Sequence, residues 1–552
     1  MTSADSAPAN LPPVLRPERP PVRSLRELAG RVGGELRNDD ADDITLTGIT
    51  LATADLRPGE AFVAIRGVNR HGAEFAAAAA AAGAVAVITD AAGAESATGA
   101  GIPVVVVDDP RARLGELSAW VYGTGADDDL PLLLGTTGTN GKTSVSHLLE
   151  GILGQLGVVT GLSSTAERHI AGEVIVSRLT TPEASEFHAL LALMRERGVQ
   201  AVAVEVSAQA LSRHRVDGLM FDVAAFTNLS HDHLDDYADM HEYLEAKLPL
   251  FRADRARRAV ICLDSPAGAD VAARCEVPSC TIVTPAIAAN GDTDADWHVE
   301  IVAERQDGTT FTLTARDGRS LTTIVPTIGR HMAANAGLAI VMALQAGYSW
   351  ERLVAALDGG RIDAYLPGRT QLVSGSEGPA VYVDFGHSPD AFEKTLAAVR
   401  RVTPGKVLFV MGADGDRDAT KRLDMGRTGA EGSDIFIVTD HHPRFEDPDA
   451  IRAALLEGAR RAHSGAEILE YSPPERAILE AVRLAGPGDA ILWCGPGHQD
   501  YRDIRGVRTP YSARELARRA LRDAGWPVPD PVWPVPYPDD STPLSDPARD
   551  WR

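Results

Sequence analysis

Apolar runs alternate with amphipathic stretches along most of the chain. Near the N-terminus a helical pattern (SLRELAGRVGG) precedes the short strands ITLTGITL and EAFVAI, an alanine-rich helix and the strand AVAVITD. Farther along, uninterrupted apolar segments read VQAVAVEVS, FDVAAFTNL, AVYVDF, KVLFVMGA, DIFIVTD and DAILWCG. Strands that are apolar on both faces and are separated by helices indicate parallel sheets with helices on both sides. The pattern therefore predicts an α/β protein.

Changes in composition divide this pattern into units, and 552 residues suit three or four domains of ordinary size. The predicted divisions are a disordered N-terminus (1–23), a small α/β domain (24–125), a central domain (126–366), a third domain (367–525) and a Pro/Trp-rich tail (526–552). The N-terminus is rich in proline and polar residues. The tail repeats Trp-Pro-Val-Pro, and we expect it to be loosely packed, with a polyproline-type strap or a partner motif as the alternative.

Charge and composition narrow the possible partners. The formal net charge of -23 repels nucleic acid and anionic membranes, so we expect neither as a partner. The apolar runs are too short for a membrane span, and the N-terminus lacks the pattern of a signal peptide. Four cysteines do not make a disulfide framework and indicate a reducing, cytoplasmic compartment. We expect small-molecule substrates; the oligomeric state is open, with a monomer as the default.

A glycine-rich turn carries the first chemical signal. Residues 135–143 read GTTGTNGKT, between an apolar strand and an amphipathic helix. Such a turn points backbone N–H groups inward above a helix N-terminus, which suits phosphate groups. Lys142 adds a point charge, and the Thr143 hydroxyl can ligate Mg²⁺. Thr136 stands where the general phosphate-loop pattern has glycine, but the strand and helix around the turn favour a nucleotide site over an accidental turn.

The segment GTNGKT resembles the phosphate loop of Mur ligases and folylpolyglutamate synthases. Further segments resemble Mur ligase motifs in the family's order, over most of the chain: AVEVSAQALSRHRVDG, FTNLSHDHLDDY, EYLEAKLPLF, LPGRTQLV, VDFGHSPDAFEKTL, GADGDRDATKR, DHHPRFEDP and GPGHQDY. GDRDATKR and PRFEDP look most like the subfamily that adds the third amino acid of the peptidoglycan peptide. The resemblance implies three domains: a small N-terminal acceptor-binding domain, a central phosphate-loop ATPase domain with a parallel sheet, and a C-terminal Rossmann-like domain.

The resemblance also implies the reaction. A Mur ligase transfers the γ-phosphoryl group of ATP to an acceptor carboxylate, and an amine then attacks the acyl phosphate. Here the acceptor would be of the UDP-N-acetylmuramoyl-L-alanyl-D-glutamate type and the amine an amino acid, as in cell-wall biosynthesis. Because several negative charges must be held together, the chemistry needs ATP, Mg²⁺ (two ions are expected) and fixed cations.

By resemblance, particular residues hold the nucleotide and the metal. The expected ATP-binding residues are Gly138, Thr139, Asn140, Gly141, Lys142, Thr143, Asn335, Arg369 and Asp384. The expected catalytic residues are Lys142, Glu205, His233, Lys247 and Arg369. The expected Mg²⁺ ligands are Thr143, Glu205, His233 and a carbamate formed by CO₂ on Lys247. From the residues alone, Glu205 is costly at the end of an apolar strand unless it binds a metal, whereas Lys247 reads as a solvated helix residue.

Substrate-binding residues follow from the same resemblance. The expected contacts to the acceptor are Thr53, Thr180, Thr181, Ser207 and Arg215. The expected contacts to the incoming amino acid are Arg417, His441, His442, Arg444, Gly495 and Gln499. An arginine fork suits a carboxylate, although acidic neighbours leave a surface ion pair as an alternative for Arg417 and Arg444.

The chain departs from the family mainly at substrate contacts. The segment Ala52-Thr53-Ala54 stands for the usual Asp-Ser-Arg, the pair His441-His442 for Asp-Asn, and Gln499 for a glutamate that would pair with a distal ammonium. Met332 replaces an asparagine and Asp414 a glycine. One alternative is therefore the same chemistry on another acceptor or amine in specialised metabolism. A second is a non-catalytic nucleotide-binding protein. Paired histidines could also give pH sensitivity.

Overall fold

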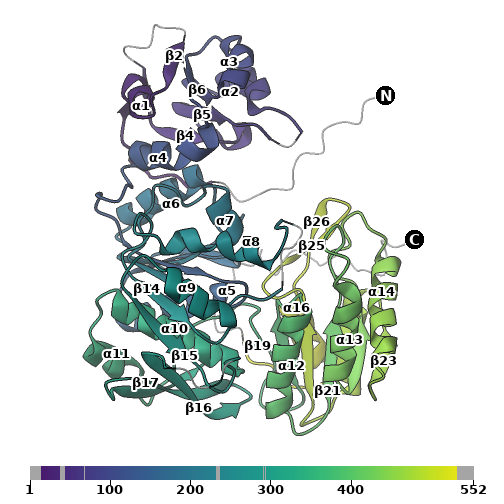
Figure 1. The fold of residues 1–552 in the computed structure, drawn as a ribbon. Helices are drawn as coiled ribbons and strands as arrows, with labels where there is room; N and C mark the ends of the chain where they lie inside the picture. Colours follow the sequence, from purple (N-terminus) through teal and green to yellow (C-terminus); the bar gives the residue numbers. More distant parts are fainter. Residues whose placement is uncertain are drawn as a thin grey trace, which may run out of the picture.

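Three α/β units form the protein. The computed structural model describes residues 14–37, 44–67, 69–231, 236–289, 291 and 294–530. The first unit stands on the second, and the third lies beside the second (Figure 1). Each unit contains a sheet whose central strands are parallel, which confirms the α/β class that the apolar runs predict. None of the described helices is both long enough and apolar enough to cross a bilayer.

The first unit is built on a five-stranded sheet with the order β2-β7-β6-β5-β4. Its strands are β2 (Glu35–Arg37), β4 (Gly48–Thr50), β5 (Glu60–Ala64), β6 (Ala86–Thr89) and β7 (Val104–Val106), and β1 (Arg23–Ser24) pairs separately with β3 (Thr45–Leu46). Its helices are α1 (Leu25–Arg31), η2 (Thr53–Asp55), η3 (Gly72–Phe75), α2 (Ala76–Ala81), α3 (Ala91–Thr98) and α4 (Pro110–Tyr122). Helices α1 and α4 cover one face of the sheet, and α2 and α3 cover the other.

The central unit contains an eleven-stranded sheet with the order β11-β10-β9-β12-β8-β13-β14-β15-β16-β17-β18. Its strands are β8 (Leu132–Thr137), β9 (Thr160–Ser163), β10 (Glu167–Ile170), β11 (Glu173–Val176), β12 (Ala201–Glu205), β13 (Val223–Phe226), β14 (Ala259–Cys262), β15 (Ser279–Val283), β16 (Trp297–Arg305), β17 (Gly308–Ala315) and β18 (Ser320–Val325). Strands β9 to β16 in this order are parallel, and antiparallel strands extend both edges.

Helices bury both faces of the central sheet. They are α5 (Lys142–Gln155), α6 (Ala184–Glu196), α7 (Ala208–Ser212), α8 (Met240–Glu245), η4 (Leu248–Phe251), α9 (Pro266–Arg274), α10 (Arg330–Gln345) and α11 (Trp350–Leu357). On β8, Leu134 packs into the core under α5 and α10, whereas Leu133 packs into the core under α6. Neighbouring residues of one strand thus enter two cores, which explains the uninterrupted apolar run.

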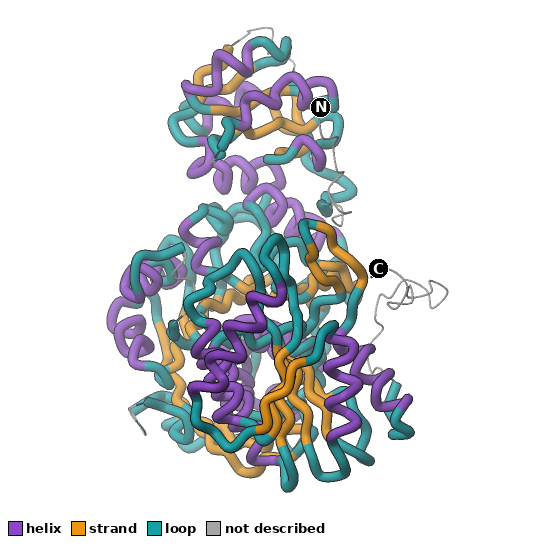
Figure 2. Tube along the Cα trace, turned by 90° about the vertical axis from the view of Figure 1, so that its right-hand side faces the viewer, coloured by secondary structure: helices purple, strands orange, loops and turns teal. Residues whose placement is uncertain are grey.

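The third unit contains a six-stranded sheet with the order β19-β20-β24-β21-β22-β23. Its strands are β19 (Gln371–Leu372), β20 (Ala380–Asp384), β21 (Val407–Met411), β22 (Ile435–Val438), β23 (Glu467–Glu470) and β24 (Ala490–Cys494), with a ribbon of β25 (Tyr501–Ile504) and β26 (Val507–Pro510). Its helices are α12 (Pro389–Val402), α13 (Arg422–Gly432), α14 (Pro448–Arg461), α15 (Pro474–Leu484) and α16 (Ala513–Asp523). Helices α12 to α14 pack on one face, and α15 and α16 on the other. Figure 2 shows helices on both sides of the strands.

The described part of the N-terminal segment corrects one prediction. Residues 14–23 were expected to be disordered, but Val14 is buried, and Arg16 Nε lies 2.6 Å from Glu60 Oε1 in an ion pair with almost no exposure. The backbone N–H groups of Glu18 and Arg19 donate to Glu196 of the central unit. The proline-rich composition indicated disorder because it gives no sign of these specific ion-pair and hydrogen-bond contacts. Residues 1–13 and 531–552 lie outside the described residues; at the start of the tail, Trp526 packs against the core beneath α16.

We expect Arg16→Ala to destabilise the first unit by about 3–5 kcal/mol, because Glu60 would remain buried without its partner. Arg37→Ala is the matched control, since Arg37 pairs with Glu35 at the exposed surface; it should cost no more than about 1 kcal/mol. Urea unfolding of both variants measures the difference. Equal losses would show that the Arg16 ion pair does not anchor the segment.

A buried histidine gives a second prediction. His188 Nε2 donates to Asp217 O at 3.0 Å, so Nδ1 accepts from the Thr124 hydroxyl, and burial lowers the pKa of His188 to about 4. The unfolded chain binds a proton near pH 6.5 and the folded chain does not. The contribution of His188 to stability should therefore fall by up to about 1.4 kcal/mol per pH unit as the pH drops from 6.5 towards 4. His188→Gln should flatten this slope, and the exposed His241→Gln should not; identical slopes would contradict the assignment.

Candidate active site

The phosphate loop joins β8 to α5 and matches the predicted geometry. Gly138 and Gly141 have positive φ angles of 142° and 91°. A Cβ atom at Gly138 would collide with Thr227 Oγ1, and one at Gly141 would lie 2.7 Å from Asn335 Oδ1. Both positions therefore require glycine for space as well as for backbone conformation. Lys142 begins helix α5, which places the helix N-terminus directly after the loop.

The loop after β13 holds the phosphate loop in place. Thr139 N donates to Asn228 O at 2.8 Å, and Asn140 N donates to Asn228 Oδ1 at 3.1 Å. Thr227 Oγ1 donates to Asn140 O at 2.7 Å. Thr227 and Asn228 were not among the sequence candidates, although both lie in the segment FTNL that resembles a family motif. Their role is to fix the loop's backbone, which no residue pattern reveals.

Thr143, Glu205 and Arg369 form a connected group beside the loop. Thr143 Oγ1 donates to Glu205 Oε2 at 2.9 Å and accepts from Arg369 Nη2 at 3.0 Å. Thr165 N also donates to Glu205 Oε2, at 2.8 Å. Glu205 ends β12 and is buried. Burial lowers the pKa of Arg369, while the charges of Glu205 and Asp384 act in the opposite direction. The three predicted residues therefore come together as a buried, charged group.

Two lysines converge on one carbonyl group of the loop. Lys142 Nζ donates to Gly138 O at 3.1 Å and to Thr139 O at 2.9 Å. Lys247 Nζ donates to Gly138 O at 3.2 Å and lies 3.7 Å from the centre of the Tyr243 ring. Lys247 is only 1% exposed, so the interpretation as a solvated helix residue is wrong. His233, the remaining predicted ligand, lies outside the described residues.

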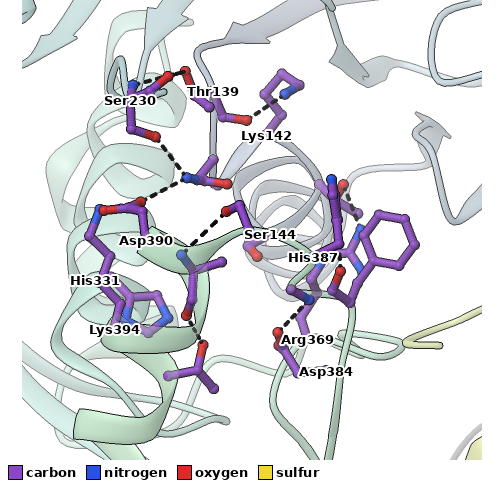
Figure 3. A pocket seen from close by; sticks show the side chains of 18 of the residues that line it. Thr139, Lys142, Ser144, Ser230, His331, Arg369, Asp384, His387, Asp390 and Lys394 are labelled. Atoms are coloured by element: carbon purple, nitrogen blue, oxygen red, sulfur yellow. Dashed lines mark hydrogen bonds and ion pairs between the residues drawn. The ribbon is translucent and has the colours of Figure 1, made fainter. Parts of the chain in front are cut away.

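Asp384 positions the segment that carries Arg369. Its Oδ2 accepts from Thr370 N at 2.7 Å and from Thr370 Oγ1 at 3.2 Å, and its Oδ1 accepts from Gly386 N at 2.7 Å. The Arg369 guanidinium lies over the Phe385 ring, 4.6 Å from its centre. Figure 3 shows Arg369 and Asp384 on the same side of the pocket. The carboxylate at the end of β20 thus holds the turn that directs Arg369 towards Thr143.

A direct contact joins the phosphate loop to the third unit. Asn140 Nδ2 donates to Ser230 Oγ at 3.1 Å and to Asp390 Oδ2 at 3.2 Å (Figure 3). Asp390 lies in the first turn of α12 and also pairs with Lys394 Nζ at 2.8 Å. Asp390 was not a sequence candidate. Asp390 lies in the segment SPDAFEKTL, which resembles a family motif, but only the fold brings this aspartate to the phosphate loop.

One cavity of about 870 Å³ lies between the central and third units. It is lined by sixteen of the predicted site residues: Thr139, Asn140, Gly141, Lys142, Thr143, Thr180, Glu205, Ser207, Asn335, Arg369, Asp384, Arg417, His441, Arg444, Gly495 and Gln499. Met332 and Asp414, two of the departures from the family, also line it. The predicted nucleotide-binding residues and the predicted amino-acid-binding residues therefore share one space.

Other predicted residues lie away from this cavity lining. Gly138 lies within the phosphate loop, and Lys247 contacts the loop through Gly138 O. His442 is hydrogen-bonded to Gln499, and Thr53 lies in η2 of the first unit. Thr181 Oγ1 donates to Glu205 O at 2.8 Å and accepts from Ser207 N at 3.2 Å, so it braces the strand end. Arg215 Nε pairs with Glu183 at 3.0 Å. Acceptor binding by Thr53, Thr181 and Arg215 remains a prediction.

His441 lines the cavity, and the ring of His442 lies beside it, with the two ring centres 4.1 Å apart. His442 Nδ1 accepts from Asp503 N at 2.9 Å, so Nε2 carries the proton and donates to Gln499 Oε1 at 2.8 Å. Burial lowers the pKa of His441 to about 3 and also lowers that of His442. Neither ring is therefore charged near pH 7, which argues against a histidine switch at neutral pH. Arg444 Nη2 lies 3.4 Å from Asp414 Oδ2, and Arg417 is exposed on the cavity wall.

Comparison with known proteins gives a consistent result. Three family models match: "Mur ligase family, catalytic domain" over residues 45–122, "Mur ligase middle domain" over 136–343 and "Mur ligase, glutamate ligase domain" over 368–497. The chain is 54% identical to the UDP-N-acetylmuramyl-tripeptide synthetase of Leifsonia xyli subsp. xyli, over 93% of this chain and 99% of that protein.

Two further relatives name the amino acid in their titles. The UDP-N-acetylmuramoyl-L-alanyl-D-glutamate–2,6-diaminopimelate ligase of Streptomyces coelicolor is 41% identical, over 92% of this chain and 98% of that protein. A solved structure of a ligase with the same title superimposes with a TM-score of 0.61 at 26% identity, covering 88% of this chain and 97% of that one. By its domains, its fold and its relatives, the chain belongs to the Mur ligase family.

Proposed function

We propose that this chain is an ATP-dependent ligase that joins an amino acid to a UDP-N-acetylmuramoyl-L-alanyl-D-glutamate-type acceptor through an acyl phosphate. The observation that carries the proposal is the group formed by Thr143, Glu205 and Arg369 beside the phosphate loop. It lies in the same cavity as Arg417 and Arg444, so phosphate chemistry and amino-acid binding can occur side by side. The relatives named above carry tripeptide-synthetase and diaminopimelate-ligase names, which supports this reaction class.

The reaction balances in two steps. An acceptor carboxylate oxygen attacks the γ-phosphorus of ATP, the bond to the β,γ-bridging oxygen breaks, and ADP leaves with the electron pair. The amine of the amino acid then attacks the acyl carbon, phosphate leaves, and the amine gives up a proton. Lys142 and Arg369 supply fixed positive charge next to the phosphate loop, where negative charge accumulates. Asp384 keeps Arg369 in place during both steps.

The residues present fit Mg²⁺. The Thr143 hydroxyl and the Glu205 carboxylate are hard oxygen donors 2.9 Å apart, and Glu205 is a buried carboxylate at a strand end. Both would hold Mg²⁺, which shields the phosphate charges when bound. Lys247 is a candidate second anchor as a carbamate, since its Nζ reaches the back of the phosphate loop. His233 completes the proposed set by resemblance alone.

The substrate-facing residues leave a second candidate. Thr180 and Ser207 line the cavity next to Glu205 and suit the acceptor. The Asp414–Arg444 contact and the His442–Gln499 hydrogen bond differ from what a diaminopimelate site requires, because Arg444 and Gln499 already have partners in the protein. These contacts favour the same ligase chemistry with another amino acid. They do not bear on the acceptor.

The proposed function predicts that continued ADP release, over many turnovers, requires both the acceptor and an amino acid, because the amine is needed to consume the acyl phosphate. Lys142→Ala should lower this rate by on the order of 10²–10³-fold, because a fixed charge at the transferred phosphate is lost. Lys406→Ala is the matched control, since Lys406 is an exposed lysine directly before β21, at the amino end of that strand. Coupled ADP detection and mass spectrometry of the product measure the effect. ADP release without the acceptor, or a fully active Lys142 variant, would contradict the proposal.

Lys247→Ala gives a separate test of the carbamate. We expect it to lose most of the activity, and a short-chain carboxylate such as acetate to restore part of it by supplying the missing anion. Ethylamine should not restore it. Both additives are tested in the same ADP-release assay, with Lys142→Ala as the variant that acetate cannot rescue. Rescue by ethylamine instead would show that Lys247 acts as a cation on Gly138 O.

A further inference from the structure

Asp414 places a carboxylate in the amino-acid end of the cavity. It lies in the loop that follows β21, at the carboxyl end of the third sheet, and it lines the cavity wall. Asp414 Oδ2 lies 3.4 Å from Arg444 Nη2, and Oδ1 lies 3.5 Å from His441 Nε2. Among the described residues, the buried Oδ1 atom has no hydrogen-bond partner. Although Oδ1 itself is buried, the Asp414 side chain as a whole is 31% exposed and lines the cavity, so a cation there can approach the carboxylate.

The charge of this carboxylate is maintained by its surroundings. Burial would raise the pKa of Asp414, but His441, His442 and Arg444 outweigh burial and lower it. Since both imidazoles are neutral near pH 7, Arg444 is the neighbour that acts there. Asp414 is thus an anion at neutral pH, paired at one oxygen with a permanent cation.

The Asp414–Arg444 contact changes what Arg444 can bind. The backbone of Arg444 is held at φ 50°, with its N–H donating to Asp503 O at 3.1 Å, so the side chain is directed to one side. There it meets Asp414. A second carboxylate on the incoming amino acid would have to share this guanidinium with Asp414, and two carboxylates at one cation repel each other.

The remaining neighbours do not compensate for such a second carboxylate. His441 and His442 are neutral, and the Gln499 amide oxygen already accepts from His442. An ammonium group, by contrast, would meet the partly exposed Asp414 carboxylate without displacing any of these contacts. Arg417 remains on the cavity wall for the α-carboxylate that every amino acid carries.

We propose that Asp414 makes this ligase select an amino acid whose side chain ends in an ammonium group and lacks a second carboxylate. The protein's own carboxylate occupies Arg444 in place of the substrate's distal carboxylate and attracts the distal ammonium. This inference rests on the proposed function and names its amine class. Asp414 acts as a specificity-determining residue in the wall of the cavity that it shares with the phosphate loop.

A direct competition tests the inference. The purified full-length protein receives ATP, Mg²⁺, the UDP-linked acceptor and equal concentrations of L-lysine, L-ornithine and meso-diaminopimelate, and mass spectrometry quantifies the products. We expect the combined diamino monocarboxylic products to exceed the diaminopimelate product by about tenfold or more. Asp414→Asn should reduce this ratio by about tenfold, because the ammonium loses its anion and Arg444 becomes available. Asp414→Gly, which also removes the side-chain volume, should reduce it at least as much.

Asp418→Asn is the matched control. It removes the same charge from the same loop, but its Oδ1 accepts from Thr420 N at 2.9 Å rather than from Arg444. We expect the product ratio to stay within about twofold of the unchanged protein, since the screened field of a distant charge is small. A change as large as that of Asp414→Asn would overturn the specific role of Asp414.

The outcomes separate this inference from the proposed function. If no amine supports ADP release, the ligase proposal fails and this inference fails with it. If turnover occurs but meso-diaminopimelate is preferred, or the ratio is unchanged in Asp414→Asn, only this inference is overturned. Asp414, His441 and His442 also present ligand atoms within 4.8 Å of one another. Stoichiometric zinc that co-purifies with the protein and is lost in Asp414→Asn would make Asp414 a metal ligand and would likewise overturn it.

Discussion

The hydroxyl group of Thr143 joins three parts of the chain at the proposed reaction site. It donates to Glu205 at the end of β12 and accepts from Arg369, which lies where the chain enters the third unit. Thr143 itself stands in the first turn of α5, directly after the phosphate loop. A strand end, a helix N-terminus and an interdomain segment thus meet at one oxygen atom. The position of each depends on the other two, which ties phosphate chemistry to the arrangement of the units.

The third unit contributes to the site through more than one contact. Asp384 fixes the turn that presents Arg369, and Asp390 accepts a hydrogen bond from Asn140 of the phosphate loop. Both aspartates are near the carboxyl end of β20, where open α/β sheets place ligand-binding residues. At the same carboxyl end of the sheet, Asp414 follows β21, two strands from β20, and Arg444 follows β22, three strands from β20. The carboxyl end of one sheet therefore carries residues of both the proposed phosphate site and the proposed site for the incoming amine.

The sequence predicts well what depends on local pattern. Leu133 and Leu134 pack into opposite cores, so the apolar run in β8 correctly indicated a parallel strand. The phosphate loop could be predicted from the sequence because the glycines that its backbone conformation requires stand close together within a single turn. By contrast, the burial of Lys247 depends on its packing behind a loop more than a hundred residues away. The Arg16–Glu60 pair and the Asp414–Arg444 pair likewise join distant segments, and such tertiary contacts leave no periodic signal in the sequence.

The central claim is that the phosphate loop and the Thr143 group bring the terminal phosphate of ATP against the acceptor carboxylate. Transfer of an isotope tests it most directly, using an acceptor whose reacting carboxylate is labelled with ¹⁸O. We expect an ¹⁸O atom to move from the carboxylate to inorganic phosphate with each amide bond formed, alongside the release of ADP. Unlabelled phosphate, or label in AMP with release of pyrophosphate, would contradict it.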